Sequence, residues 1–147
     1  MSNPNIEATY GLAPAQEGML FHSVLEAEGG FYVTQLTCGV RGAKIEVLVR
    51  AWQEVVNRHP IFRTAFAWKG VQKPVQVVGR RATLPVVQED WRARTEAERA
   101  AALEAWLEAD RRKGFDLARA PLMRLALLRT GEAEWTLVWT HHHLLLD

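Results

Sequence analysis

Two apolar segments near the C-terminus place the strongest limit on how this chain can fold. Residues 122–129 and 135–141 are rich in leucine, valine and tryptophan, and the second segment alternates large apolar side chains with smaller or polar ones. Alternation with a period of two is typical of a half-buried strand. The residues that separate the segments include Gly131, so the sequence predicts an antiparallel hairpin.

The remaining chain mixes predicted helices with predicted strands. The clearest helix is expected over residues 45–56, where apolar side chains recur at spacings of three and four. A second helix is expected to begin at Pro14, and a third to run from Thr95 to about residue 112, with Thr95 and Glu98 in a capping-box pattern. Further strands are expected over residues 31–40, 62–68, 74–78 and 84–90. This pattern predicts an α+β fold or a two-layer α/β sandwich with about three helices.

Composition excludes several classes of protein. With 147 residues, 48% of them hydrophobic, the chain can bury one sizeable core and is one domain at most. A net charge of +1 gives no reason to expect a nucleic-acid or membrane-surface partner. The single cysteine, Cys38, cannot form an internal disulfide, which fits a reducing cytoplasm, and we expect it to be a small buried side chain. Residues 1–10 are polar, lack the features of a signal peptide and are expected to be a leader or linker.

The chain ends in three histidines, three leucines and a carboxylate, over residues 141–147. On a regular strand His141 and His143 share one face and His142 points to the other, which is a poor arrangement for chelating one metal ion. No cysteine or carboxylate lies at a zinc-like spacing nearby, so we expect no metal site. Histidine titrates near neutral pH, so these residues are candidates for a general base or for a partner of a transition state. They are equally compatible with a histidine-rich terminus that has no role.

Three stretches of the chain carry a family resemblance. In the last one, His142 and His143 are followed after three residues by Asp147, while residues 12–22 read LAPAQEGMLFH and residues 58–66 read RHPIFRTAF. Taken in chain order, the three stretches resemble the first core motif, the RHExLRTxF motif and the HHxxxDG motif of condensation domains from nonribosomal peptide synthetases. The second stretch departs from its motif at Pro60 and Phe62, which replace a glutamate and a leucine.

The resemblance implies a chloramphenicol-acetyltransferase-like fold of two lobes, with the active site in a tunnel between them. Residues 11–147 would be the N-terminal lobe, truncated inside the HHxxxDG motif, with a mixed or antiparallel sheet. The wording of residues 16–22 is similar to the subclass that takes a D-configured donor and an L-configured acceptor. The family's complete domain is several times longer, so we expect the isolated chain to be inactive.

The activity implied by the resemblance is amide bond formation between two thioesters. They are delivered on the phosphopantetheine arms of upstream and downstream peptidyl carrier proteins, and no directly bound cofactor is implied. His143 matches the motif histidine that takes a proton or stabilises the tetrahedral intermediate. His142, Asp147 and Arg63 match residues that maintain the active-site region. Asp147 would pair either with Arg63 or with a basic residue beyond the end of this chain.

Three alternatives remain open. An epimerisation domain shares the histidine motif and the fold, a non-catalytic carrier-docking module would need no complete tunnel, and a coenzyme A acetyltransferase is a more distant relative. The expected partners are the two carrier proteins and the missing C-terminal lobe, with no nucleic acid and no membrane. An uncovered apolar face also predicts self-association of the chain.

Overall fold

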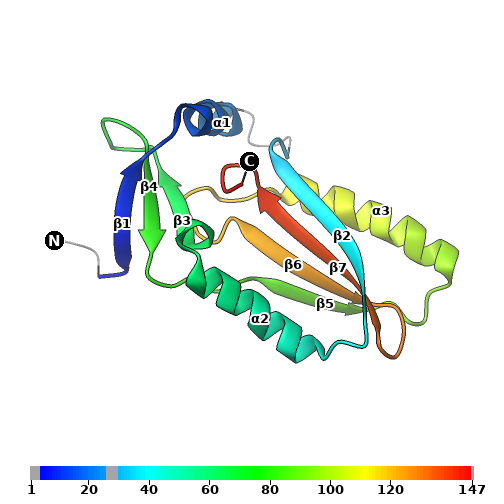
Figure 1. Ribbon diagram of the computed structural model, residues 1–147. Helices are drawn as coiled ribbons and strands as arrows, with labels where there is room; N and C mark the ends of the chain where they lie inside the picture. The colour runs from blue at the N-terminus through cyan, green and yellow to red at the C-terminus, as the bar shows by residue number, and fades with distance from the viewer. Residues whose placement is uncertain (1–3, 26–29, 147) are drawn as a thin grey trace.

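The computed structural model describes residues 4–25 and 30–146 and has the mixed α/β architecture that the sequence predicts (Figure 1). Within these ranges, seven strands form two sheets, accompanied by three α-helices and one short 3-10 helix, Pro60–Arg63. The smaller sheet lies on the side of the N-terminus, and the larger sheet carries the C-terminal hairpin.

The larger sheet is built around the predicted hairpin. Its strand order is β2 (Val33–Arg41), β7 (Glu134–His142), β6 (Met123–Arg129) and β5 (Val86–Asp90). β6 and β7 pair antiparallel, with Leu127 opposite Leu137, and β2 pairs antiparallel with β7 along its whole length. β5 runs parallel to β6, which requires a crossover between them, and α3 (Glu96–Lys113) supplies it. The central strand β7 is therefore hydrogen-bonded on both edges.

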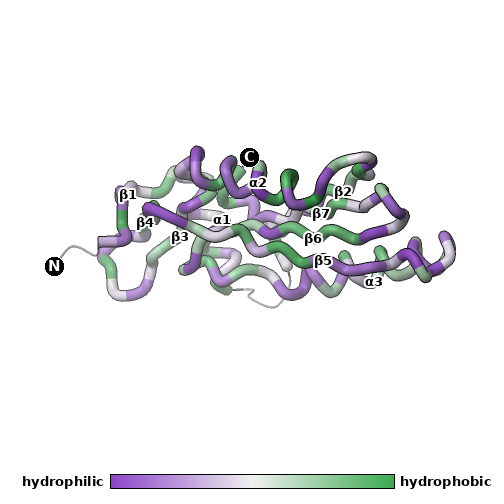
Figure 2. The backbone as a smooth tube through the Cα atoms, turned by 90° about the horizontal axis from the view of Figure 1, so that it is seen from below, coloured by the Kyte–Doolittle hydropathy of each residue, from purple (hydrophilic) through white to green (hydrophobic). Residues whose placement is uncertain are grey.

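Both faces of this sheet are covered, because alternate residues of the hairpin point to opposite sides. Leu125, Leu127 and Leu137 pack in a core that includes α2 (Ile45–Arg58). Their neighbours Ala126, Leu128 and Val138 pack against α3. Figure 2 shows α2 and α3 on opposite sides of the sheet. Burial on both faces explains why the sequence of β6 is an almost continuous apolar run.

The smaller sheet includes a strand in a segment that was expected to be a leader or linker. Its order is β1 (Ile6–Gly11), β4 (Val75–Gly79) and β3 (Thr64–Ala67), with both pairs antiparallel. Residues 1–10 were expected to be a leader or linker, but residues 6–10 belong to β1. The segment is mostly polar and exposed, so only its pairing with the distant β4 identifies it as a strand. Regular secondary structure among the described residues therefore begins at Ile6.

Two local expectations also differ from the structure. Residues 62–68 were expected to be one strand, but the 3-10 helix at Pro60–Arg63 precedes β3, because proline suits the first turn of a helix. The Thr64 hydroxyl donates to the Pro60 carbonyl (2.9 Å) and closes this turn. Cys38 was expected to be buried, but it is exposed, because β2 lies at the edge of the larger sheet.

The helix boundaries follow the predicted signals. At the start of α3 the Thr95 hydroxyl accepts from the Glu98 N–H (3.2 Å), and the Glu98 carboxylate accepts from the Thr95 N–H (2.7 Å), which confirms the capping box. Gly114 follows α3 with a φ of 59°, a conformation that favours glycine. α1 (Pro14–Leu25) begins at Pro14 as predicted and lies beside the C-terminal end of β7 (Figure 1). No helix within the described ranges is long and apolar enough to cross a membrane.

Because both faces of the hairpin are buried, a cavity created there should lower the free energy of unfolding strongly. Leu127 is fully buried, so we expect Leu127→Ala to lower the free energy of unfolding by about 2–5 kcal/mol. Val87→Ala on β5 is the matched control, because Val87 is 46% exposed and its truncation should change the free energy by less than about 0.5 kcal/mol. Urea unfolding of both variants measures the difference, and equal values would mean that this core is not closely packed.

Candidate functional site

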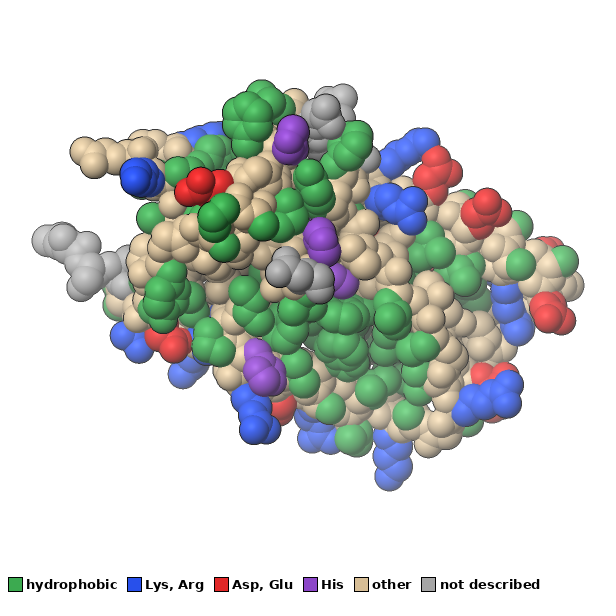
Figure 3. Space-filling model, turned by 45° about the horizontal axis from the view of Figure 1, so that its top comes forward, with side chains coloured by type: hydrophobic (Ala, Val, Ile, Leu, Met, Phe, Trp, Pro, Cys, Tyr) green, Lys and Arg blue, Asp and Glu red, His purple; other side chains and the backbone are tan. Residues whose placement is uncertain are grey.

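β7 carries the three histidines to the end of the sheet that lies beside α1. His141 and His142 are the last residues of β7, and His143 begins the turn that follows. The His142 N–H donates to the Leu122 carbonyl (3.0 Å) on one side, and the His143 N–H donates to the Tyr32 carbonyl (2.7 Å) on the other. The backbone of this site is therefore held from both neighbouring segments. Figure 3 shows histidine side chains among apolar ones on this face of the molecule.

His142 is neutral, and both of its ring nitrogens are engaged. Its Nδ1 accepts from the Leu144 N–H (3.1 Å), and its Nε2 lies 3.3 Å from the Ser23 hydroxyl on α1. Because that hydroxyl donates to the Met19 carbonyl (2.7 Å), its oxygen accepts from His142, which places the ring proton on Nε2. Burial, and then the positive charges of His143 and His141, lower the pKa of His142 to about 4. His142 is thus a structural element of the turn at neutral pH.

His141 is held by aromatic packing. Its ring stacks on Trp139 at 4.4 Å between centroids, and Trp52 of α2 contacts Trp139 at 5.4 Å. Burial, and then the charge of His143, lower the pKa of His141. Its Nδ1 makes no hydrogen bond to any residue that the structure describes. The stack orients the ring, and we assign His141 no chemical role.

The surroundings of the His143 ring differ from those of both neighbouring histidines. The side chain is half-buried, and within residues 4–25 and 30–146 its imidazole makes no hydrogen bond. A neutral imidazole offers one donor and one acceptor, so His143 can accept a proton from a substrate or donate a hydrogen bond to one. The two adjacent histidines can therefore do different things. Both ring nitrogens of His142 bond within the fold, whereas the ring of His143 can hydrogen-bond to a substrate.

Residues of α1 support the turn after the histidines, a contribution that the sequence analysis missed. Gln16 donates from Nε2 to the Leu144 carbonyl (3.2 Å), and its Oε1 accepts from the Ala13 N–H (2.9 Å) and from Gln76 Nε2 (3.0 Å). This amide joins α1, β4 and the turn. Gln16 lies inside the stretch 12–22 and Ser23 directly follows it, so the first motif was the available signal, although it does not reveal their partners.

Arg63 has a carboxylate partner that the sequence analysis did not name. The side chain is buried, and its Nη1 donates to Glu7 Oε2 (2.6 Å) and to the Gly79 carbonyl. These bonds tie the 3-10 helix to β1 and β4. Asp147 lies outside the described residues, so its pairing with Arg63 or with another basic residue stays a prediction.

The cavity beside His142 is small. The cavity beside His142 has a volume of about 70 Å³, well below the roughly 300–1,000 Å³ of typical small-molecule sites. It is lined by Ser23, Gly30, Phe31, Val33, Gly114, Phe115, Leu117 and His142. Among the described residues, no group of three or more histidine, cysteine or acidic side chains is placed to hold a metal ion.

Comparisons with known sequences agree with the three motifs. A family model described as the condensation domain matches residues 6–147. A linear gramicidin synthase of Brevibacillus parabrevis is 50% identical over 145 residues, which cover 99% of this chain and 3% of the relative. A plipastatin synthase of Bacillus subtilis (strain 168) is 40% identical over 144 residues, covering 97% of this chain and 4% of the relative. The chain thus spans only a few per cent of the length of these relatives.

Solved structures agree with the fold. The starter condensation domain of rhizomide synthetase superposes with a TM-score of 0.83 at 25% identity, covering 96% of this chain and 35% of that one. A four-domain nonribosomal peptide synthetase bound to AMP and glycine superposes with a TM-score of 0.86 at 20% identity, covering 100% of this chain and 11% of that one. These matches confirm the predicted fold class.

The neutral state of His142 predicts a pH-dependent stability. Its pKa is about 4 in the fold and about 6.5 in an unfolded chain, so the unfolded state binds more protons between these values. The contribution of His142 to the free energy of unfolding should be fully present above pH 6.5. It should be lost as the pH drops toward 4, which lowers the free energy of unfolding by roughly 3 kcal/mol at most. Urea unfolding between pH 7.5 and 4.5 measures the slope.

His142→Asn tests the assignment, because the asparagine oxygen can still accept from the Leu144 N–H but does not titrate. We expect a shallower slope for this variant than for the wild type. Val87→Ala, which changes an exposed side chain on β5 and leaves every titratable group in place, should retain the wild-type slope. Equal slopes for all three proteins would contradict the assignment.

Proposed function

We propose, from the premise that this chain belongs to the condensation domain family, that it is the N-terminal lobe of an enzyme joining two carrier-bound thioesters through an amide bond. The lobe comprises residues 6–147, and a second lobe completes the active-site tunnel. The chain's alignment with about a third of a solved condensation domain supports this division. By itself the chain is then inactive, because half a tunnel cannot enclose two substrates.

In the proposed reaction, the α-amine of the downstream aminoacyl thioester attacks the carbonyl carbon of the upstream thioester. The C–N bond forms, the C–S bond breaks, and the proton lost by the amine ends on the released thiol of the upstream phosphopantetheine arm. A free α-amine has a pKa of about 7.7–8.0, so an appreciable fraction is already neutral at pH 7. Positioning of the two thioesters therefore contributes more than generation of a strong base.

The free ring of His143 is the observation that carries the proposal. Its backbone is held by Tyr32, but its imidazole is not committed to any described residue. Such a ring can accept a hydrogen bond from the attacking amine, take its proton, or stabilise the tetrahedral intermediate. His142 has neither nitrogen available and supports the turn instead.

Two further residues complete the proposed active-site region. Arg63 acts structurally, because its bonds to Glu7 and Gly79 hold the 3-10 helix against the smaller sheet. Asp147 is proposed to hold the turn after His143. The phosphopantetheine arms belong to the substrates, and the upstream and downstream carrier proteins are the proposed partners. The sequence of residues 16–22 supports a D-configured donor and an L-configured acceptor. The proposed location of the protein is the cytoplasm.

The function predicts that His143→Ala removes most of the activity. The assay uses the chain together with its second lobe, with donor and acceptor carriers loaded through phosphopantetheine and the amide product followed by intact-protein mass spectrometry. We expect kcat to fall by about 10²–10⁴-fold in the variant, the range for loss of a proton-transfer residue. Asp90→Asn, outside the three motif stretches, is the control and should retain wild-type turnover.

Other outcomes identify the alternatives. Release of a D-aminoacyl product without amide formation would identify an epimerisation domain. Binding of carriers with no product from any D- or L-configured donor would support a docking module. Full turnover by His143→Ala would remove this residue from the mechanism while leaving the family assignment intact.

Exposed apolar side chains predict self-association of the chain. Phe21 is 62% exposed and Leu25 66% exposed on α1, and Phe31 is 54% exposed nearby in the sequence. Apolar side chains in such number usually find a partner. Sedimentation should therefore show concentration-dependent association that weakens in a Phe21→Ser, Leu25→Ser double variant. A clean monomer at high concentration would contradict this expectation.

A further inference from the structure

A buried carboxylate joins α3 to three strands of the larger sheet, β2, β6 and β7, close to the histidines. Asp110 is 8% exposed, and its Oδ2 accepts from the Thr140 hydroxyl (2.7 Å) and from Gln35 Nε2 (2.9 Å). Its Oδ1 accepts from Arg124 Nε (2.6 Å). Burial by itself raises the pKa of Asp110, but the hydrogen bonds from Arg124, Thr140 and Gln35 outweigh it, so the pKa lies below the ordinary value. The side chain is therefore a buried anion.

Arg124 on β6 completes this ion pair and caps the end of α3. Its Nη2 donates to the Asp110 carbonyl (2.6 Å) and its Nη1 to the Gly114 carbonyl (2.6 Å). A cation at the C-terminal end of a helix is favourable, because the last carbonyls of the helix lack partners. The guanidinium also lies over the ring of Phe115, 4.3 Å from its centroid.

Two routes lead from this ion pair to His142. Along β7, Thr140 is the residue before His142 on the same strand face, so Asp110 bonds to the strand two residues from the histidine. Through the rings, Phe115 meets His142 edge-on, at 6.4 Å between centroids and an interplanar angle of 84°. Phe115 thus contacts both the Arg124 guanidinium and the His142 imidazole.

We propose that Asp110 is a positioning residue for the proposed reaction: through Thr140, and through the Arg124–Phe115 stack, it holds the His142 ring in the orientation that places His143. The inference rests on the proposed function for its catalytic meaning, but its structural content is independent of that function. His142 transmits the effect, because its Nδ1 holds the Leu144 N–H and so shapes the turn that contains His143.

The chemistry of the contacts explains why a charge occupies this position. An apolar side chain of similar volume would fill the space and often stabilises a protein as well as a buried ion pair does. It would not impose directions on Thr140, Gln35 and Arg124 at once, whereas the two carboxylate oxygens do. The network therefore defines geometry more than it adds stability.

The first test follows the His142 ring in the whole chain by NMR titration. In the wild type the His142 pKa is expected near 4, with the ring proton on Nε2. Asp110→Asn should loosen Phe115 and admit water, which moves the pKa upward toward the ordinary value of about 6.5. The titratable groups that face His142 within the described residues are Tyr32, His141 and His143, and none is altered by this change.

Two other variants keep the test decisive where Asp110→Asn does not fold. Thr140→Val keeps the side-chain shape and removes only the bond along β7, while Phe115→Leu keeps the ion pair and removes the ring beside His142. Each of these variants should also raise the His142 pKa, but by a smaller amount than Asp110→Asn does. The increase in the His142 pKa should be larger in Asp110→Asn than in either of these variants, because Asp110→Asn affects both routes.

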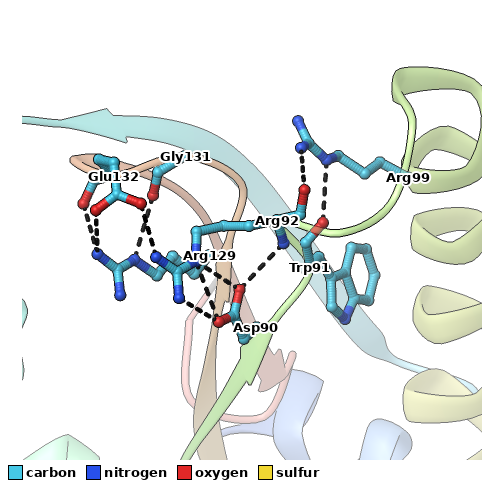
Figure 4. Close-up of polar contacts among 7 residues, drawn as sticks. All are labelled: Asp90, Trp91, Arg92, Arg99, Arg129, Gly131 and Glu132. Atoms are coloured by element: carbon cyan, nitrogen blue, oxygen red, sulfur yellow. Dashed lines mark hydrogen bonds and ion pairs between the residues drawn. The ribbon is translucent and has the colours of Figure 1, made fainter.

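Asp90→Asn is the matched control, since it removes a carboxylate–arginine pair at the far end of the same sheet. Figure 4 shows Asp90 bonded to Arg92, next to the hairpin residues Arg129 and Glu132. Arg129 pairs with Trp135 near the start of β7, so this site lies roughly 24 Å of strand from His142. The control should leave the His142 pKa near its wild-type value.

The second test measures turnover in the protein that includes the second lobe. Misplacement of His143 should lower kcat in Asp110→Asn and Thr140→Val by about tenfold to a hundredfold with little change in KM, and Asp90→Asn should match the wild type. If the unaltered protein forms no amide product, the proposed function fails while the NMR result still decides the positioning role. Folded Asp110→Asn and Thr140→Val proteins with a His142 pKa near 4 would overturn the inference.

Discussion

The arrangement of this lobe depends on the pairing of β7 along both of its edges. β2 and β6 bond to the strand from either side, and cores built around α2 and α3 bury its two faces. A strand enclosed in this way cannot slip by one residue without moving its apolar set to the wrong face. The enclosure extends to His142, so the register that forms the core also determines where the histidines lie.

The period of two along β7 separates the roles of adjacent histidines. His142 points to the side of α1 and α3, where burial keeps its ring neutral and both nitrogens find partners. His141 faces the opposite side and stacks on Trp139. His143 follows the last strand residue, and its ring makes no hydrogen bond to any residue that the structure describes. The end of β7 and the turn that follows it therefore supply a structural histidine and an available imidazole at neighbouring positions.

Polar contacts that reach across the chain complete the site. Gln16 ties α1 to the turn after His143, Arg63 ties the 3-10 helix to Glu7, and Asp110 ties α3 to β7. A buried polar group requires its partners, because each unmade bond costs about 1–3 kcal/mol. These contacts therefore specify one arrangement of α1, α3 and the two sheets, on which the geometry around His143 depends.

Sequence alone determined the features that arise from local chemistry. The hairpin follows from the apolar run at 122–129, the alternation at 135–141 and the turn between them. α2 follows from its apolar spacing, and the start of α3 from the reciprocal hydrogen bonds of Thr95 and Glu98. The motifs around His143 identified the family. Tertiary structure alone decided that residues 6–11 form a strand, that Arg63 pairs with Glu7, and that Asp110 lies beside Thr140. The physical reason is separation: periodicity and caps act within a few residues, whereas these partners are brought together only when the sheets and helices pack.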